Sequence, residues 1–403
     1  MKRLVLCALA GPALAAAAAA IEPMEQGGVA TLPPLGAHLV WVPDRLFGHS
    51  LLFDGDTGKV LGSIDAGAVL TPKPPLYARG RGEIYSVDTA YSRGRRGERV
   101  DFVTIYDPVS LAVRGEILLP TRTAESNASL AYAELLDGEA FLAAFNQFPT
   151  TSVSIVDLAA RSFVAEIPLA GCAGIYPVSE GRFATLCGDG TVIAVSLDAA
   201  GRKAGLAHSA PFFDAVTDPV AMAAARSGPR WWFVSFAGRV HELDFSGKEP
   251  GLAASWSLLD EADQAAGWRP GGLQHVALHR GSGRLYTVMH QGGPGSHKEA
   301  GPEIWVYDVE KQARVARFPV PNLAAAFLGV NLGAEAGSML RRVLEWVIPN
   351  QGVQSIAVTQ DEAPLLFARH GELGAVAVLD AASGSHLRDL EEAGLAGPTL
   401  AVP

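Results

Sequence analysis

The chain has 403 residues, of which 49% are hydrophobic and only 18% are charged, and its formal net charge is −10. A charge of this sign argues against nucleic acid or an anionic membrane surface as the main partner. The composition also argues against extensive disorder, because disordered chains are poor in apolar residues and rich in charge.

The first twenty residues have the pattern of a secretory signal peptide. Two basic residues precede an apolar stretch, residues 4–20, which ends in consecutive alanines. A basic start, an apolar centre and small residues at the cleavage point define such a leader. Because the stretch is short and contains Gly11-Pro12, a retained membrane anchor is the less favoured interpretation. We therefore expect cleavage of a leader at 1–20, a linker over 21–34, and an exported protein without a stable membrane span.

A short phrase recurs seven times along the rest of the chain: an apolar run, an aspartate, a few turn-forming residues and, in most copies, a second apolar run. Its aspartates are Asp54, Asp107, Asp157, Asp198, Asp244, Asp308 and Asp380. The apolar runs are only four to six residues long, which predicts β-hairpins and leaves no room for ordinary helices. Neighbouring aspartates lie 41 to 72 positions apart, close to the length of one four-stranded blade with its loops. The sequence therefore predicts an all-β fold, a seven-bladed β-propeller over residues 35–403.

A group of arginines early in the chain is basic, although the chain as a whole carries a net negative charge. Its members are Arg79, Arg81, Arg93, Arg95, Arg96 and Arg99. The favoured interpretation is a solvated loop. The alternative is an electrostatic docking surface for an acidic partner.

Two cysteines, Cys172 and Cys187, remain after the leader, and they flank a turn at 179–182. This places one cysteine on each leg of a hairpin, where the two side chains can face each other across adjacent strands. In an oxidising compartment such a pair should form a disulfide. A redox-active pair is the rival interpretation, but it lacks Cys-x-x-Cys spacing and a basic neighbour that would lower a thiol pKa.

Four histidines in the second half form a candidate metal site. His275 and His279 have the i, i+4 spacing of zinc ligands on a helix, but their surroundings predict a strand, so metal binding is disfavoured. His290 and His297 flank a glycine-rich loop and join them in a weak hypothesis of a metal-assisted enzyme. The chain has no nucleophile elbow, phosphate-binding loop or dinucleotide fingerprint. No catalytic, cofactor-binding or metal-ligating residue is therefore assigned.

Residues 322–350 interrupt the repeat before its last copy. Apolar residues recur at helical spacing between 334 and 348, which predicts an inserted amphipathic helix. The favoured interpretation is that the helix packs over an edge of the propeller. Alternatively, Phe327, Leu340 and Trp346 are candidates for a surface that docks a partner or a membrane.

Several stretches together resemble the heavy subunit of periplasmic quinoprotein amine dehydrogenases. One is Ala266-Gly267-Trp268-Arg269-Pro270-Gly271-Gly272. The others are residues 91–102, 106–109, 172–190, 297–298 and 361–366. The resemblance extends from about residue 35 to the end of the sequence.

The resemblance implies a seven-bladed propeller in a two-plus-two assembly with a small light subunit. In that family the light subunit carries tryptophan tryptophylquinone, which oxidatively deaminates primary amines to aldehydes, and electrons pass to a cupredoxin. The resemblance also implies a disulfide in the hairpin that holds Cys172 and Cys187, and it places the protein in the periplasm. The chain itself is then not catalytic.

Two departures from the family bear on function. An aromatic residue near the family's substrate channel is replaced by Ala68, Val69 and Leu70, which become the candidates for lining that channel, so the amine preference is not inherited. The insertion at 322–350 is foreign to the family. The alternative hypothesis is therefore a non-catalytic periplasmic scaffold, diverged from this family, that docks a different partner.

Overall fold

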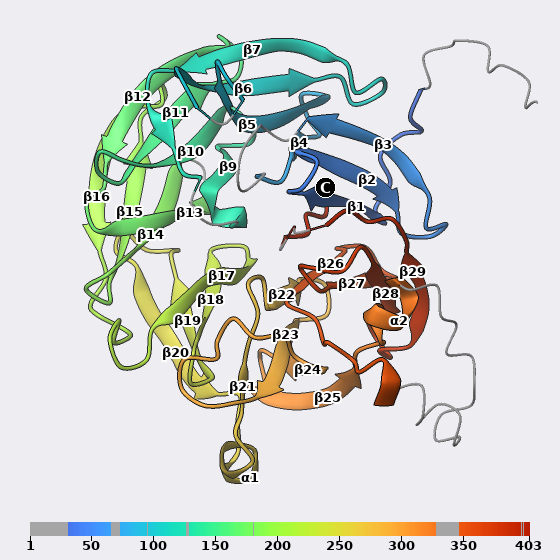
Figure 1. Cartoon of the computed structure of the whole chain (residues 1–403). Helices are drawn as coiled ribbons and strands as arrows, with labels where there is room; N and C mark the ends of the chain where they lie inside the picture. Colours follow the sequence, from blue (N-terminus) through green and yellow to red (C-terminus); the bar gives the residue numbers. More distant parts are fainter. Residues whose placement is uncertain are drawn as a thin grey trace, which may run out of the picture. The chain divides into compact units, whose positions relative to one another are not determined.

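The structure is a computed structural model that describes residues 31–65, 73–94, 96–125, 129–179, 181–327, 346–395, 397 and 399–403. The expected signal peptide lies outside the described residues, as does all but the end of the linker. Leu32–Pro403 form one compact unit. Within it, seven antiparallel sheets are arranged radially in a ring (Figure 1), which confirms the predicted seven-bladed β-propeller.

In each blade the strands follow the chain from the inside of the ring outwards, and in blades 3 and 6 the first two short strands share the innermost position. Blade 1 holds β1 (Leu39–Asp44), β2 (His49–Asp54) and β3 (Val60–Asp65); blade 2 holds β4 (Leu76–Ala78), β5 (Glu83–Tyr91), β6 (Arg99–Tyr106) and β7 (Val113–Leu119). Blade 3 holds β8 (Arg122–Thr123), β9 (Ala133–Leu136), β10 (Phe141–Phe148), β11 (Ser152–Asp157) and β12 (Ser162–Pro168); blade 4 holds β13 (Cys172–Ser179), β14 (Arg182–Cys187), β15 (Val192–Leu197) and β16 (Lys203–His208). Blade 5 holds β17 (Val220–Ser227), β18 (Arg230–Ser235), β19 (Arg239–Asp244) and β20 (Gly251–Ser257); blade 6 holds β21 (Trp268–Pro270), β22 (Val276–His279), β23 (Arg284–Gln291), β24 (Glu303–Asp308) and β25 (Ala313–Pro319). Blade 7 holds β26 (Ser355–Val358), β27 (Leu365–Arg369), β28 (Val376–Asp380) and β29 (His386–Leu390).

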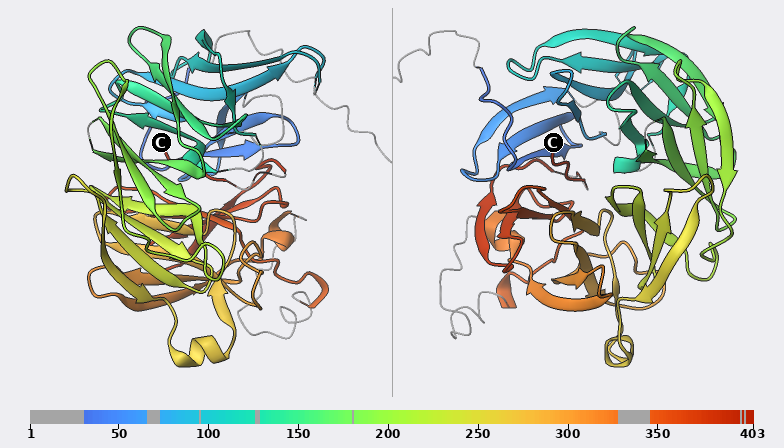
Figure 2. Two further views of the ribbon diagram at one scale, coloured as in Figure 1. Left: turned by 90° about the vertical axis from the view of Figure 1, so that its left-hand side faces the viewer. Right: turned by 180° about the vertical axis from the view of Figure 1, so that it is seen from behind.

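The short helices whose bounds fall within the described residues are η1 (Leu130–Tyr132), α1 (Glu261–Ala265) and α2 (Leu323–Phe327). Helix α1 begins with a capping box, in which Asp260 and Asp263 satisfy each other's backbone N–H groups. It projects outward from blade 6, beyond the rim of the ring (Figures 1 and 2). In the described part of the chain, no helix has the length and apolar character needed to cross a membrane.

The ring is closed by the segment 399–403, which lies inside blade 1. Ala401 pairs with Trp41 through two backbone hydrogen bonds, of 2.7 and 3.1 Å, and so adds the inner strand that blade 1 otherwise lacks. The Gln274 side chain of blade 6 bonds both the N–H and the C=O of Leu400, at 3.0 and 2.9 Å. Leu400 is completely buried. The first blade is thus built from both ends of the described chain.

The seven repeated aspartates share one structural task. Each ends or directly follows the last strand but one of its blade, and its side chain accepts backbone N–H groups in the turn to the outer strand. In blade 2, Asp107 accepts the N–H groups of Val109 and Ser110, both at 2.8 Å. These bonds favour the ionised carboxylate and lower the pKa of Asp107 to about 2. The recurring phrase is therefore the outer hairpin of each blade.

The inserted segment is described only at its two ends. Helix α2 ends at Phe327, and residues 328–345, which include Leu340 and most of the expected helix, lie outside the described residues. Trp346 is 82% exposed, whereas Leu323, at the start of α2, is buried in the core shared by blades 6 and 7. The start of the insertion thus packs onto the propeller.

Candidate functional site

Chain direction divides the propeller into two ends with different chemistry. Because neighbouring strands are antiparallel, the connections from one blade to the next emerge at the same end as the loops between the second and third strands. We call this the loop end. The opposite end carries the aspartate turns described above, and we call it the turn end.

Large apolar side chains are exposed in connections at the loop end. Phe47, Phe148 and Trp346 are 70%, 58% and 82% exposed, and Val216 and Val347 are also exposed. Exposed aromatic residues of this kind are enriched where proteins bind other proteins. The loop end is therefore the candidate interaction face.

Three of the four predicted histidines gather at the loop end, and the fourth does not. His275 and His290 are buried, and His297 stacks face to face on Phe236 with ring centroids 3.8 Å apart. Burial, with the charges of His297 and His290, lowers the pKa of His275 to about 4, so this ring is neutral at neutral pH. His279 lies near the turn end, where its two ring nitrogens contact Ser282 Oγ and the Asp361 carbonyl oxygen, at 2.8 and 2.9 Å.

The four histidines therefore do not form the single site of the metal hypothesis. Among the described residues, no three His, Cys, Asp or Glu side chains are placed to hold a metal ion. The separation follows from the strand: residues four apart on an extended chain lie roughly 13 Å apart rather than on one helical turn.

The structure also divides the arginine group. Arg79 and Arg81 occupy a turn at the turn end, where Arg81 donates to the Tyr85 hydroxyl and the Leu158 carbonyl oxygen, at 3.1 and 2.9 Å. Arg99 is mostly buried and pairs with Asp101 at 2.7 Å. Only Arg93 and Arg96 stand exposed in the loop between β5 and β6, and Arg95 lies outside the described residues. The group is therefore not one docking surface.

The candidates for lining the substrate channel, Ala68, Val69 and Leu70, lie outside the described residues. The next described residue after them is Lys73. Lys73 is buried, and its Nζ donates to Thr123 Oγ1 at 3.3 Å and to the Val87 carbonyl oxygen at 3.4 Å. Burial lowers the pKa of the Lys73 ammonium even though Asp88 and Asp101 oppose this effect. This contact was not predictable, because a lone lysine after a loop has no distinguishing sequence pattern.

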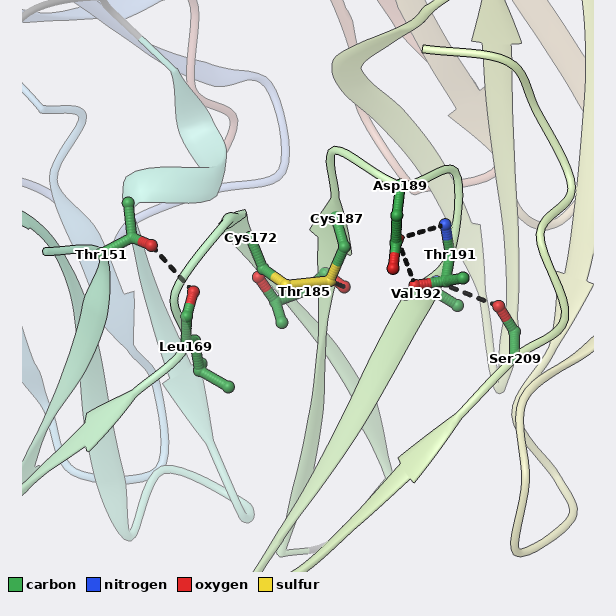
Figure 3. Close-up of a disulfide and its surroundings, with 9 residues drawn as sticks. All are labelled: Thr151, Leu169, Cys172, Thr185, Cys187, Asp189, Thr191, Val192 and Ser209. Atoms are coloured by element: carbon green, nitrogen blue, oxygen red, sulfur yellow. Dashed lines mark hydrogen bonds between the residues drawn. A yellow bond between two sulfur atoms is a disulfide. The ribbon is translucent and has the colours of Figure 1, made fainter.

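Cys172 and Cys187 are joined by a disulfide at the loop end of blade 4 (Figure 3). They are paired directly across β13 and β14, and both are buried. A buried bond between two regular strands suits a structural role and gives a thiol partner no access.

Replacing both cysteines by alanine is expected to lower the free energy of unfolding by about 3 kcal/mol, because the bond closes a loop of 15 residues in the unfolded chain. Denaturant unfolding of the two proteins, with and without a reductant, measures the difference. The reductant should destabilise the parent protein and leave the double variant unchanged. Equal midpoints for parent and variant would contradict the prediction.

The comparisons with known proteins agree with this architecture. Residues 45–332 match the family described as "Methylamine dehydrogenase heavy chain (MADH)". The methylamine dehydrogenase heavy chain of Paracoccus versutus is 27% identical over 355 residues, which cover 87% of this chain and 75% of that one. The corresponding protein of Methylobacillus flagellatus is 26% identical over 408 residues, which cover 97% of this chain and 93% of the relative.

Solved structures share the fold at lower identity. Dihydro-heme d1 dehydrogenase NirN superposes with a TM-score of 0.54 at 15% identity, over 92% of this chain and 76% of that chain. A functionally unknown protein from Desulfotomaculum acetoxidans gives a TM-score of 0.54 at 14% identity, over 91% of this chain and 98% of the other. These two similarities concern the fold alone. The family match covers more than two thirds of the sequence and confirms the resemblance seen there, so this chain belongs to the methylamine dehydrogenase heavy chain family.

Proposed function

We propose that this chain is the heavy subunit of a periplasmic amine dehydrogenase. It holds a small light chain whose tryptophan tryptophylquinone oxidises primary amines to aldehydes, and the electrons pass to a cupredoxin. The observation that carries the proposal is the family match over residues 45–332, together with curated relatives named as methylamine dehydrogenase heavy chains. With identities of 25–27%, the proposal names the class of primary amines and no single substrate.

The tryptophans of this chain support a cofactor on another polypeptide. A quinone built from two linked tryptophans needs two such rings in contact at an accessible place. Trp231 and Trp232 adjoin in sequence but pack into different cores on opposite faces of β18. Trp268 and Trp305 are in contact, with centroids 5.1 Å apart, but Trp305 is completely buried beneath two arginine side chains. These pairs, taken from the described residues, do not fit the quinone.

The task of this chain is then to bind and orient the light subunit. The loop end supports that task because Phe47, Phe148 and Trp346 offer apolar anchors on a rigid ring. The disulfide and the buried Lys73 stiffen two connections at the same end. When the light subunit is bound, its quinone supplies the electron-accepting chemistry.

Purification of the tagged chain from the native periplasm tests this proposal. A small disulfide-rich chain should copurify, and the complex should reduce a dye only when a primary amine is added. Mass analysis of that small chain should show the added oxygens and lost hydrogens of a quinone made from two tryptophans. Copurification of an unrelated protein, without amine-dependent dye reduction, would favour the scaffold hypothesis instead.

A further inference from the structure

Two adjoining cavities lie on the axis of the propeller. They have volumes of about 400 and 100 Å³. Their walls come from the inner strands β4, β9, β13, β17, β22 and β26 and from the segment 399–403, so all seven blades contribute. We call the two cavities together the axial channel. The larger one has the size of a small-molecule site.

Most of the channel wall is apolar or already satisfied. Leu76, Leu130 and Leu135 are partly exposed and line the larger cavity. The side-chain amide of Gln274 bonds the carbonyl oxygens of Ile356 and Leu400, both at 2.9 Å. Each inner strand lies at the edge of its sheet, so some of its backbone N–H and C=O groups face the axis.

Glu134 is the exception in this wall. It lies on β9 and lines both cavities, and the structure gives its carboxylate no hydrogen bond or ion pair with any described residue. Burial raises the pKa of Glu134 to about 8, although the charge of Arg226 opposes this shift. A carboxyl group without a partner, in a cavity wall whose other polar side chains are mostly engaged, is costly to keep, which makes it a candidate ligand-binding group.

Arg226 does not neutralise Glu134 directly. Its Nε donates to the Gly228 carbonyl oxygen at 3.0 Å and its Nη2 to the Val178 carbonyl oxygen at 3.4 Å, and its guanidinium lies 5.9 Å from the centroid of the Trp231 ring. These contacts hold the guanidinium against the wall and use two of its donor nitrogens.

The other charged groups near the channel are also engaged. Arg280 donates to the side-chain oxygen of Gln360, and Arg79 to the Pro403 oxygen, both at 3.0 Å. The neighbouring elements β4, β10, β13 and η1 add no charged side chain toward Glu134, only tyrosines such as Tyr77 and Tyr176. The unpaired Glu134 carboxyl group therefore makes the cavity favour a cation over an anion.

We propose that the axial channel binds a small primary alkylammonium ion, with the Glu134 carboxylate accepting hydrogen bonds from the ammonium group and Leu76, Leu130 and Leu135 contacting the alkyl tail. An ammonium group has three N–H donors, which the carboxylate and the exposed backbone edges can share. A hard metal ion is disfavoured because it requires about six oxygen ligands, several of them carboxylates. An anion is disfavoured by the carboxyl group and by the engaged Arg226.

Calorimetric titration of the full chain with n-butylammonium chloride tests this inference. One saturable site is expected at pH 8. Because binding favours the ionised carboxylate, it releases a proton from Glu134, so the observed heat should depend on the ionisation enthalpy of the buffer. Because burial raises the pKa of the free carboxyl group to about 8, the apparent affinity should be at least about tenfold weaker at pH 6 than at pH 8.

Two matched variants locate the site. Glu134→Gln keeps the shape and removes the charge, and it should weaken binding at least about tenfold, the effect of losing one charge-assisted contact. Glu116→Gln, on the exposed face of β7, should bind as the parent does. Ala224→Leu, which narrows both cavities, should also weaken binding while the thermal unfolding profile shows that the protein is folded.

Three results would overturn the inference: no saturable heat with the parent protein, unchanged affinity in Glu134→Gln, or tighter binding of sodium butyrate than of n-butylammonium. The inference goes beyond the proposed function and does not depend on a light subunit, because binding is measured on this chain alone. A failure of amine oxidation in the copurified complex would leave these titrations unaffected.

Discussion

Deletion of residues 399–403 is expected to lower the free energy of unfolding by about 6 kcal/mol. The deletion removes the buried side chain of Leu400, which contributes about 2 kcal/mol through its apolar surface. It also breaks four hydrogen bonds to Trp41 and Gln274, each worth about 1 kcal/mol. Because globular proteins are stable by only about 5–15 kcal/mol, the ring loses a large share of its stability.

Denaturant unfolding of parent and truncated protein measures this loss. Two controls separate its causes. Leu400→Ala keeps the backbone pairing and should cost about 2–3 kcal/mol. Removal of Pro403 alone leaves the Trp41 and Gln274 contacts in place and should change stability by less than about 1 kcal/mol. An unfolding midpoint of the truncated protein equal to that of the parent would show that blade 1 does not need the segment.

Arg369→Met is expected to destabilise the protein by about 3–5 kcal/mol, because it leaves buried polar groups without partners. Arg369 is completely buried at the end of β27 and donates to the carbonyl oxygens of Pro43, Ala393 and Gly394, at 2.8, 3.0 and 3.2 Å. Burial lowers the pKa of its guanidinium to about 10, with Asp44 as the nearby opposite charge. The side chain joins blade 7 to blade 1 at the loop end.

Thermal and denaturant unfolding of Arg369→Met test the prediction against Arg122→Met as the matched control. Arg122 is exposed on β8, and its replacement should change stability by less than about 0.5 kcal/mol. If both variants unfold at the same denaturant concentration, the seam between blades 1 and 7 does not depend on the guanidinium.

The blade pattern was predictable because it is local. Asp107 and its six counterparts act within three or four residues of their own position, so turn chemistry and strand composition indicate the outer hairpins without knowledge of the rest of the fold. The paired cysteines were predictable for the same reason, since their hairpin is formed by one continuous stretch.

Features made by distant segments were not predictable. The pairing of Ala401 with Trp41 joins residues more than three hundred positions apart, and a single extended residue gives no signal of its partner. Glu134 sits in the run Ala133–Leu136, which reads as an ordinary strand, and only the ring places its carboxyl group on the axis. The strand at Val276–His279 was predictable from its surroundings, and it separates His279 from the other three histidines, as expected when metal binding was disfavoured.

Blade 1 combines strands from the start of the described chain with residues 399–403, so it cannot be completed until synthesis is nearly finished. Synthesis proceeds from the amino end, so β1, β2 and β3 leave the ribosome long before the strand that completes their sheet. Until residues 399–403 arrive, Trp41 presents an unpaired backbone edge, and such an edge readily captures strands from other molecules. A stalled or prematurely released chain would therefore have six complete blades and one unpaired strand edge in blade 1. We expect chaperones and proteases to recognise such a chain.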